Sequence, residues 1–96
     1  MTIKKLMSAL TLLSVKLETI GTRSLGRECM ELANALVDDS FSLKDDVVLI
    51  YDPLDRDPFI STGNFALYRT ENVDDSIYIF VSEDLKNIMD KNNLTF

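Results

Sequence analysis

The uncharged run Val47–Tyr51 constrains the fold of this 96-residue chain more than any other stretch. Three of its five residues are β-branched, and aspartates stand at positions 45, 46 and 52 on either side of it. A short apolar run with polar ends is typical of a buried strand. The runs 65–70 and 77–81 are also apolar and aromatic, and the residues between them suit a hairpin loop. The second half of the chain therefore predicts a three-stranded, mostly antiparallel sheet, and Phe59 and Ile60 have the character to extend an edge strand.

The first half of the chain predicts two helices. Within 3–20, apolar residues recur at steps of three and four, which gives one apolar face on a helix. The residues of that face are Ile3, Leu6, Met7, Leu10, Leu13, Leu17 and Ile20. Leu12 and Val15 widen the face, so burial on more than one side is expected. Gly21 stands where a glycine cap ends a helix, and 22–37 reads as a second helix, so an antiparallel hairpin is predicted.

The end of the chain predicts a third, short helix. Ser82 has the position of an N-cap, and Glu83 and Asp84 follow in the first turn, where the helix dipole favours anions. Residues 92–96 are expected to fray. The predicted fold is thus one α+β domain over residues 1–96, with element order ααβββα: a helical hairpin on the sheet, then the short helix, in two layers.

Charge and composition exclude several kinds of function. The net charge is −6, which disfavours general binding to nucleic-acid phosphate or anionic lipid. There is no His and only one Cys, Cys29, so zinc sites of the Cys/His type and internal disulfides are excluded. We expect no cofactor, no membrane segment and a cytoplasmic location, since a single Cys fits a reducing compartment.

Acidic residues concentrate in the second part of the chain. Residues 1–37 carry five basic and three acidic side chains, whereas residues 38–96 carry five basic and thirteen acidic ones. Most of the acids fall in predicted turns and strand ends, where Asp is common for conformational reasons alone. The alternative interpretation is a negative surface that competes for a basic groove on another protein.

The segment Asp52–Asp57 permits a metal-binding interpretation, because it holds three closely spaced carboxylates. Its spacing fails the EF-hand pattern, which needs a central Gly and a distal Glu. The simpler interpretation is a turn in which Arg56 pairs with its neighbouring aspartates.

The strands carry a further indication of function, because both faces of the predicted sheet are apolar. Ile77, Ile79 and Val81 share one face of their strand, and Tyr78 and Phe80 share the other. One helical hairpin covers a single face, so either the last helix or a partner must cover the second one. A partner is a second copy of the chain or another protein, since aromatic side chains on an open face are typical interface anchors.

We therefore predict a non-enzymatic protein-binding module, specifically an inhibitor with a basic protein partner. A homodimer is an open alternative to the monomer. In size, acidity and lack of motifs the chain resembles phage anti-defence proteins such as anti-CRISPR and anti-restriction proteins, and equally immunity proteins and antitoxins. The alternatives are a metal-binding domain or enzyme built on Asp52–Asp57 and a structural homo-oligomer subunit. The predicted partner-binding residues are Asp74, Asp75, Tyr78, Phe80, Tyr68, Asp55 and Asp57.

Overall fold

The computed structural model describes residues 1–38, 41–51, 58–69 and 76–96. Two helices come first, then a mixed four-stranded sheet, then a third helix, which confirms the α+β prediction. In chain order the elements are α1 (Ile3–Thr19), α2 (Arg23–Asp38), β1 (Val47–Tyr51), β2 (Ile60–Thr62), β3 (Phe65–Arg69), β4 (Ile77–Val81) and α3 (Glu83–Lys91).

The sheet has four strands in the order β1-β4-β3-β2, so the prediction of three strands is wrong. The fourth strand is β2, whose Ile60 pairs with Leu67 of β3 and whose Thr62 pairs with Phe65. The sequence indicated only an edge-strand extension at Phe59 and Ile60, and a three-residue strand with a central Ser has too weak an apolar pattern to identify as a separate strand. β3 pairs antiparallel with both β2 and β4, whereas β1 pairs parallel with β4, Val47 opposite Ile77.

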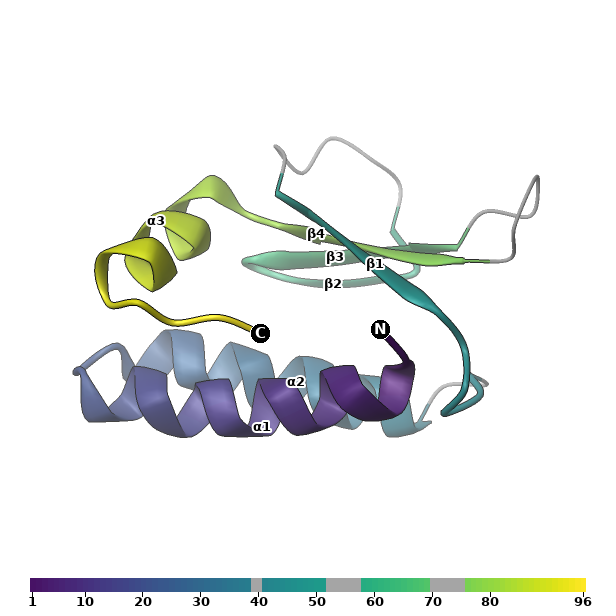
Figure 1. The fold of residues 1–96 in the computed structure, drawn as a ribbon, viewed down its shortest axis with the longest axis horizontal. Coiled ribbons are helices and arrows are strands. Elements are labelled where there is room, and N and C mark those ends of the chain that lie inside the picture. The colour runs from purple at the N-terminus through teal and green to yellow at the C-terminus, as the bar shows by residue number, and fades with distance from the viewer. Residues whose placement is uncertain (39–40, 52–57, 70–75) are drawn as a thin grey trace.

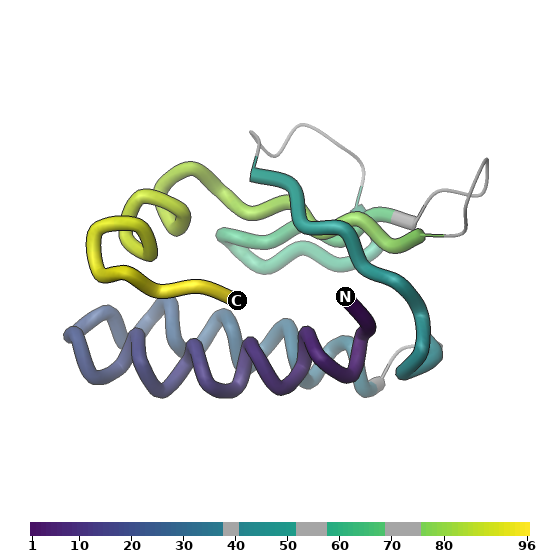
Figure 2. Tube along the Cα trace, in the orientation of Figure 1, coloured from purple at the N-terminus to yellow at the C-terminus, as the bar shows by residue number. Residues whose placement is uncertain are grey.

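The described elements form two layers (Figure 1). α1 and α2 lie antiparallel under one face of the sheet, α1 on the β1 side and α2 on the β2 side. α3 lies beyond the end of the sheet, and the chain trace then returns between α1 and the sheet, as Figure 2 shows. The first and last residues end close to the space between the layers.

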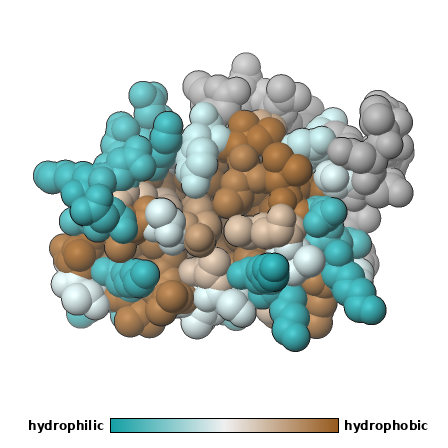
Figure 3. All heavy atoms as spheres, in the orientation of Figure 1, coloured by the Kyte–Doolittle hydropathy of each residue, from teal (hydrophilic) through white to brown (hydrophobic). Residues whose placement is uncertain are grey.

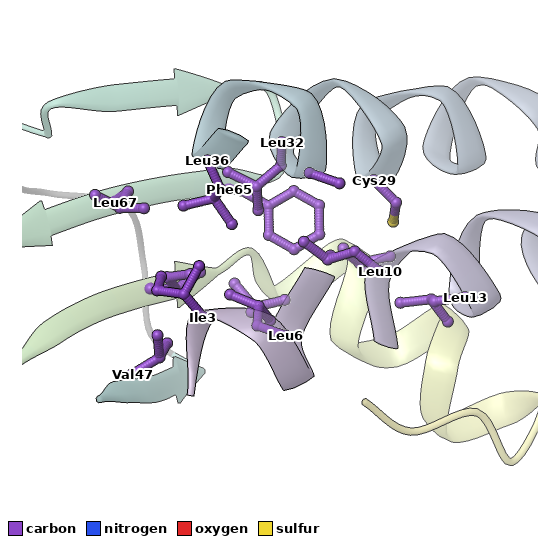
Figure 4. Packing of buried hydrophobic residues seen from close by; sticks show 14 of the residues in the cluster. Ile3, Leu6, Leu10, Leu13, Cys29, Leu32, Leu36, Val47, Phe65 and Leu67 are labelled. Atoms are coloured by element: carbon purple, nitrogen blue, oxygen red, sulfur yellow. The ribbon is translucent and has the colours of Figure 1, made fainter. Parts of the chain in front are cut away.

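The core lies between the two layers, and the predicted stripe of α1 forms its lower side. Leu6, Leu10 and Leu17 are fully buried, and Figure 4 shows side chains of α1 and α2 around the ring of Phe65. The hydroxyl of Thr2 caps α1 by accepting from the Lys5 N–H. The buried hydrophobic cluster comprises Ile3, Leu6, Leu10, Leu13, Leu17, Cys29, Leu32, Ala33, Leu36, Val47, Phe65, Leu67, Ile77, Ile79, Val81, Leu85 and Met89.

The turn between the helices confirms the predicted glycine cap. Gly21 has a φ of +90°, which residues with a Cβ rarely adopt. The N–H of Gly21 donates to the carbonyl of Glu18, and the N–H of Thr22 donates to that of Leu17. This pair of hydrogen bonds is the Schellman motif that commonly ends a helix, and it turns the chain back so that α2 packs against α1.

Two predictions about exposure are wrong. Leu12 and Val15 are each 57% exposed, so α1 is buried on one side only. The end of the chain is packed, because Asn93 adopts a φ of 55° and the Leu94 N–H donates to the carbonyl of Met89 at 2.8 Å. This turn directs the last residues back to the core, where the ring of Phe96 meets that of Phe65 edge-on at 6.3 Å between centroids.

Candidate functional site

The face of the sheet opposite α1 and α2 is the candidate binding surface, and we call it the outer face. Alternation along the strands places Val47, Leu49, Leu67, Ile77 and Ile79 toward the helices, where all five belong to the core or pack against it. The intervening side chains point away from the helices. In the register of the sheet these outer-face residues are Val48, Ile50, Tyr78, Phe80, Ala66, Tyr68 and Ser61.

Two tyrosines lie side by side at the middle of the outer face. Tyr68 of β3 is the direct partner of Tyr78 of β4, and Val48 of β1 stands opposite Tyr78 on the other side. Both tyrosines are half-buried, and Val48 is 39% exposed. These three side chains form a row across three strands, as expected for neighbours on one face of a sheet.

The structure places the three predicted aromatic residues on this face but gives them different exposures. Tyr68 and Tyr78 present part of their surface to solvent, whereas Phe80 is only 4% exposed. Phe80 therefore offers little surface to a partner. The predicted acidic residues, Asp55, Asp57, Asp74 and Asp75, lie outside the described residues, as does the Asp52–Asp57 metal hypothesis.

Phe59 is an exposed aromatic residue beside this face that the predicted site omitted. It immediately precedes β2, and its N–H donates to the carbonyl of Leu67 at 2.7 Å. Its side chain is 64% exposed, more than any other large hydrophobic residue described. The sequence indicated that Phe59 could extend an edge strand, but not that this strand pairs with β3, so it did not place Phe59 beside the tyrosines.

The third helix does not cover the outer face. Leu85 and Met89 of α3 are buried in the same cluster as α1 and α2. In Figure 1, α3 stands at the end of the sheet, and no described helix lies over the face opposite α1 and α2. The sequence left open whether the last helix or a partner covers the second face of the sheet. The prediction that the last helix covers it is wrong.

A polar network below the sheet joins α2, the turn between β2 and β3, and the start of α3. The Asn64 side-chain amide donates to the carboxylate of Glu28 and accepts from the Ser82 hydroxyl at 2.5 Å. Ser82 in turn caps α3 by accepting from the N–H of Leu85. Each of these groups is hydrogen-bonded to another, so the network connects α2, the β2–β3 turn and α3. It offers no reactive group.

Cys29 lies fully buried on α2 and is unsuited to nucleophilic catalysis. Burial, and then the charge of Glu28, raises its pKa from an ordinary 9.0 to about 12. The thiolate is the reactive form, so the folded chain holds Cys29 in its inert state at neutral pH. Cys29 therefore acts as a small buried hydrophobic residue of the core.

Native protein at pH 8 is expected to react with an aromatic disulfide reagent roughly a thousandfold more slowly than protein unfolded in urea, because the thiolate fraction falls by that factor. Absorbance of the released thiol measures both rates. Since the raised pKa exists only in the folded state, stability should fall as pH rises above 9, where the unfolded thiol loses its proton. Fast labelling of native protein would contradict this burial.

Among the described residues, no group of three or more potential ligands is arranged to hold a metal ion. No helix in this part of the chain is long and apolar enough to cross a membrane. No family model, curated protein or solved structure matches the chain.

Proposed function

We propose that this domain is a non-enzymatic binding module whose outer face docks on a basic protein partner and blocks it. The observation that carries the proposal is the row Tyr68–Tyr78–Val48, which stands on the sheet face that no described helix covers. Aromatic side chains on a flat surface supply large contact area at low entropic cost, and they are enriched at protein interfaces.

The charge of the chain supports a basic partner. Thirteen of its sixteen acidic residues lie in 38–96, the part that contains the whole sheet. Asp74 and Asp75 precede β4 in the sequence by only a few residues. Negative charge around the binding surface raises the association rate with a positively charged partner, while contacts of the aromatic row lower the dissociation rate of the complex. Within this class, we propose an inhibitor of the anti-defence kind, an assignment supported by size and acidity.

The test begins with capture from an extract of the native host on immobilised wild-type protein, on Tyr78→Ala and on Leu12→Ala. Leu12 is exposed on the opposite layer, so it serves as the matched control. We expect a basic protein that binds wild type and Leu12→Ala but is lost from Tyr78→Ala. Truncating an aromatic anchor costs about 2 kcal/mol or more, which is roughly a thirtyfold weaker affinity.

The purified partner then allows the two contributions to be separated by surface plasmon resonance. Raising salt should slow association, and so should reversing Asp74 and Asp75 to Lys, whereas Tyr78→Ala should speed dissociation. Phe59→Ala tests the same face with little risk to folding, because Phe59 is mostly exposed. Binding that ignores salt and is equal in all variants would remove the outer face from the interface.

A further inference from the structure

β1 stands at one edge of the described sheet, so among the described strands one side of its backbone has no neighbour. The N–H of Ile77 donates to the carbonyl of Asp46, and Val47 is opposite Ile77 in a parallel ladder. In such a ladder the residues that bond to the neighbour alternate. Val48 and Ile50 therefore direct their peptide groups toward β4, and Val47, Leu49 and Tyr51 direct theirs outward.

The start of this outer edge is already occupied by the chain's own first residues. The Val47 N–H donates to the carbonyl of Met1 at 2.7 Å, and the amino group of Met1 donates to the Val47 carbonyl at 3.3 Å. Thr2 forms an antiparallel bridge with Asp46. In the described part of the chain, no further hydrogen bond reaches the outward peptide groups of Leu49 or Tyr51.

The open part of the edge is apolar on both sides of the strand. Val48 is 39% exposed on the outer face, and Tyr51 is 46% exposed on the helix side, where Lys86 Nζ lies 5.4 Å from the centre of its ring. Figure 3 is taken from the side on which β1 lies in front, and it shows apolar surface gathered at the middle, between polar side chains.

β1 lacks the features that normally protect an edge strand from pairing. Natural edge strands carry Lys, Pro or a bulge, or are very short. Val47–Tyr51 contains no Pro and no charged residue, whereas the opposite edge strand, β2, is only three residues long. The part of β1 that Met1 leaves open, from Val48 to Tyr51, is therefore an unprotected apolar edge, and such an edge is expected to pair with another strand.

We propose that β1 pairs antiparallel with β1 of a second copy of this chain, with Ile50 of each copy opposite Ile50 of the other. In this register the outward N–H and C=O of Leu49 form hydrogen bonds with the C=O and N–H of Tyr51 in the second copy. Tyr51 of the first copy pairs in the same way with Leu49 of the second, which gives four hydrogen bonds in all. A shift that sets Leu49 against Leu49 places Tyr51 opposite Val47, whose groups Met1 occupies. A shift the other way sets Tyr51 against Tyr51 and leaves Leu49 without a partner in the described strand, so it gives only two hydrogen bonds.

The two-fold axis of this pairing stands perpendicular to the sheet, so both helical layers lie on the same side. Leu49 and Tyr51 then meet apolar partners on the helix side, and Ile50 meets its own copy on the outer side. The result is a continuous eight-stranded sheet. Tyr68 and Tyr78 lie on β3 and β4, away from the paired edge, so Tyr78→Ala tests partner binding separately from dimer formation.

Cysteine cross-linking tests the register. Ile50→Cys places the two sulfurs on a directly opposed pair with Cα atoms about 4.5 Å apart, within reach of a disulfide. Val48→Cys is the matched control, on the same face of the same strand, but its two copies lie roughly 14 Å apart in this register. Under mild oxidation we expect at least about tenfold more disulfide dimer from Ile50→Cys. Buried Cys29 does not compete.

The oligomeric state of the wild type tests the pairing itself. Sedimentation should show a dimer that strengthens with salt, because each copy carries a charge of −6, whereas binding of a basic partner should weaken with salt. Ile50→Lys, which opposes two cations, should leave a folded monomer, and Tyr78→Ala should leave the dimer intact. A wild type that stays monomeric at about 100 μM, or equal cross-linking of the two cysteine variants, would overturn the proposal.

Discussion

Leu10→Asp is expected to unfold the domain at room temperature. Leu10 is 0% exposed in the centre of the α1 stripe, and Figure 4 shows it directed at the core beside Phe65. A carboxylate there must be buried without a partner or drive α1 out of the core. Either course costs several kcal/mol, which is most of the stability of a small domain. The far-ultraviolet circular dichroism signal and the cooperative melting transition should both be lost.

Leu12→Asp is the matched control, two residues along the same helix. Leu12 is 57% exposed, so its replacement by Asp should change the free energy of unfolding by less than about 1 kcal/mol. If the Leu10 variant melts cooperatively near the wild-type temperature, α1 does not supply the core as described. If Leu12→Asp unfolds instead, the helix is rotated relative to the sheet.

This contrast shows how far hydrophobic periodicity goes. The spacing of Leu6, Leu10, Leu13 and Leu17 was enough to predict the buried stripe of α1, because burial on a helix follows its turn. It could not place Leu12 and Val15, since an apolar residue beside the stripe is buried only if a neighbouring element extends that far. Among the described helices α2 packs along α1, and it leaves both Leu12 and Val15 exposed to solvent.

The prediction of the sheet succeeded for features that depend on a local sequence pattern, and it failed for strand pairings between distant parts of the chain. The faces of β4 follow from alternation, and Ile77 and Ile79, which were predicted to share one face, are both fully buried. The parallel pairing of β1 with β4 joins residues thirty positions apart, and no local signal states it. The candidate site shares this limit, because Tyr78 was found from its own strand, whereas its neighbour Val48 depends on that distant pairing.

The packed C-terminus was missed for a related reason. Residues 92–96 have no periodicity, and a terminal segment with two Asn residues is typical of fraying. Just beyond the end of α3, Asn93 adopts a positive φ, and this one backbone conformation brings Leu94 and Phe96 back onto the core. Asn is one of the few residues with a side chain that tolerates this conformation, so the signal existed but is weak.

Asn64→Asp is expected to destabilise the domain by roughly 2–4 kcal/mol, although it changes a single NH₂ group to oxygen. The Asn64 amide donates to the carboxylate of Glu28 and accepts from the hydroxyl of Ser82. An aspartate keeps the bond from Ser82 but loses the donor, and it sets two carboxylates against each other in a partly buried site. Glu28 also rests against Gly63, where a Cβ would collide with its carboxylate, so it has little room to turn away.

Adding Glu28→Gln to Asn64→Asp is expected to restore most of the lost stability. The amide introduced on α2 then donates to the carboxylate introduced in the β2–β3 turn, so the bond is remade with donor and acceptor exchanged, and Ser82 continues to cap α3. Glu28→Gln alone pairs two amides, which can still form the bond after a rotation of one of them, so it should cost less than Asn64→Asp alone. Urea unfolding of the four proteins gives the coupling energy, expected between about 1 and 3 kcal/mol in favour of the exchanged pair. Additive losses would mean that the contact between α2 and the β2–β3 turn contributes nothing to stability, and that α2 is held to the sheet by apolar packing alone.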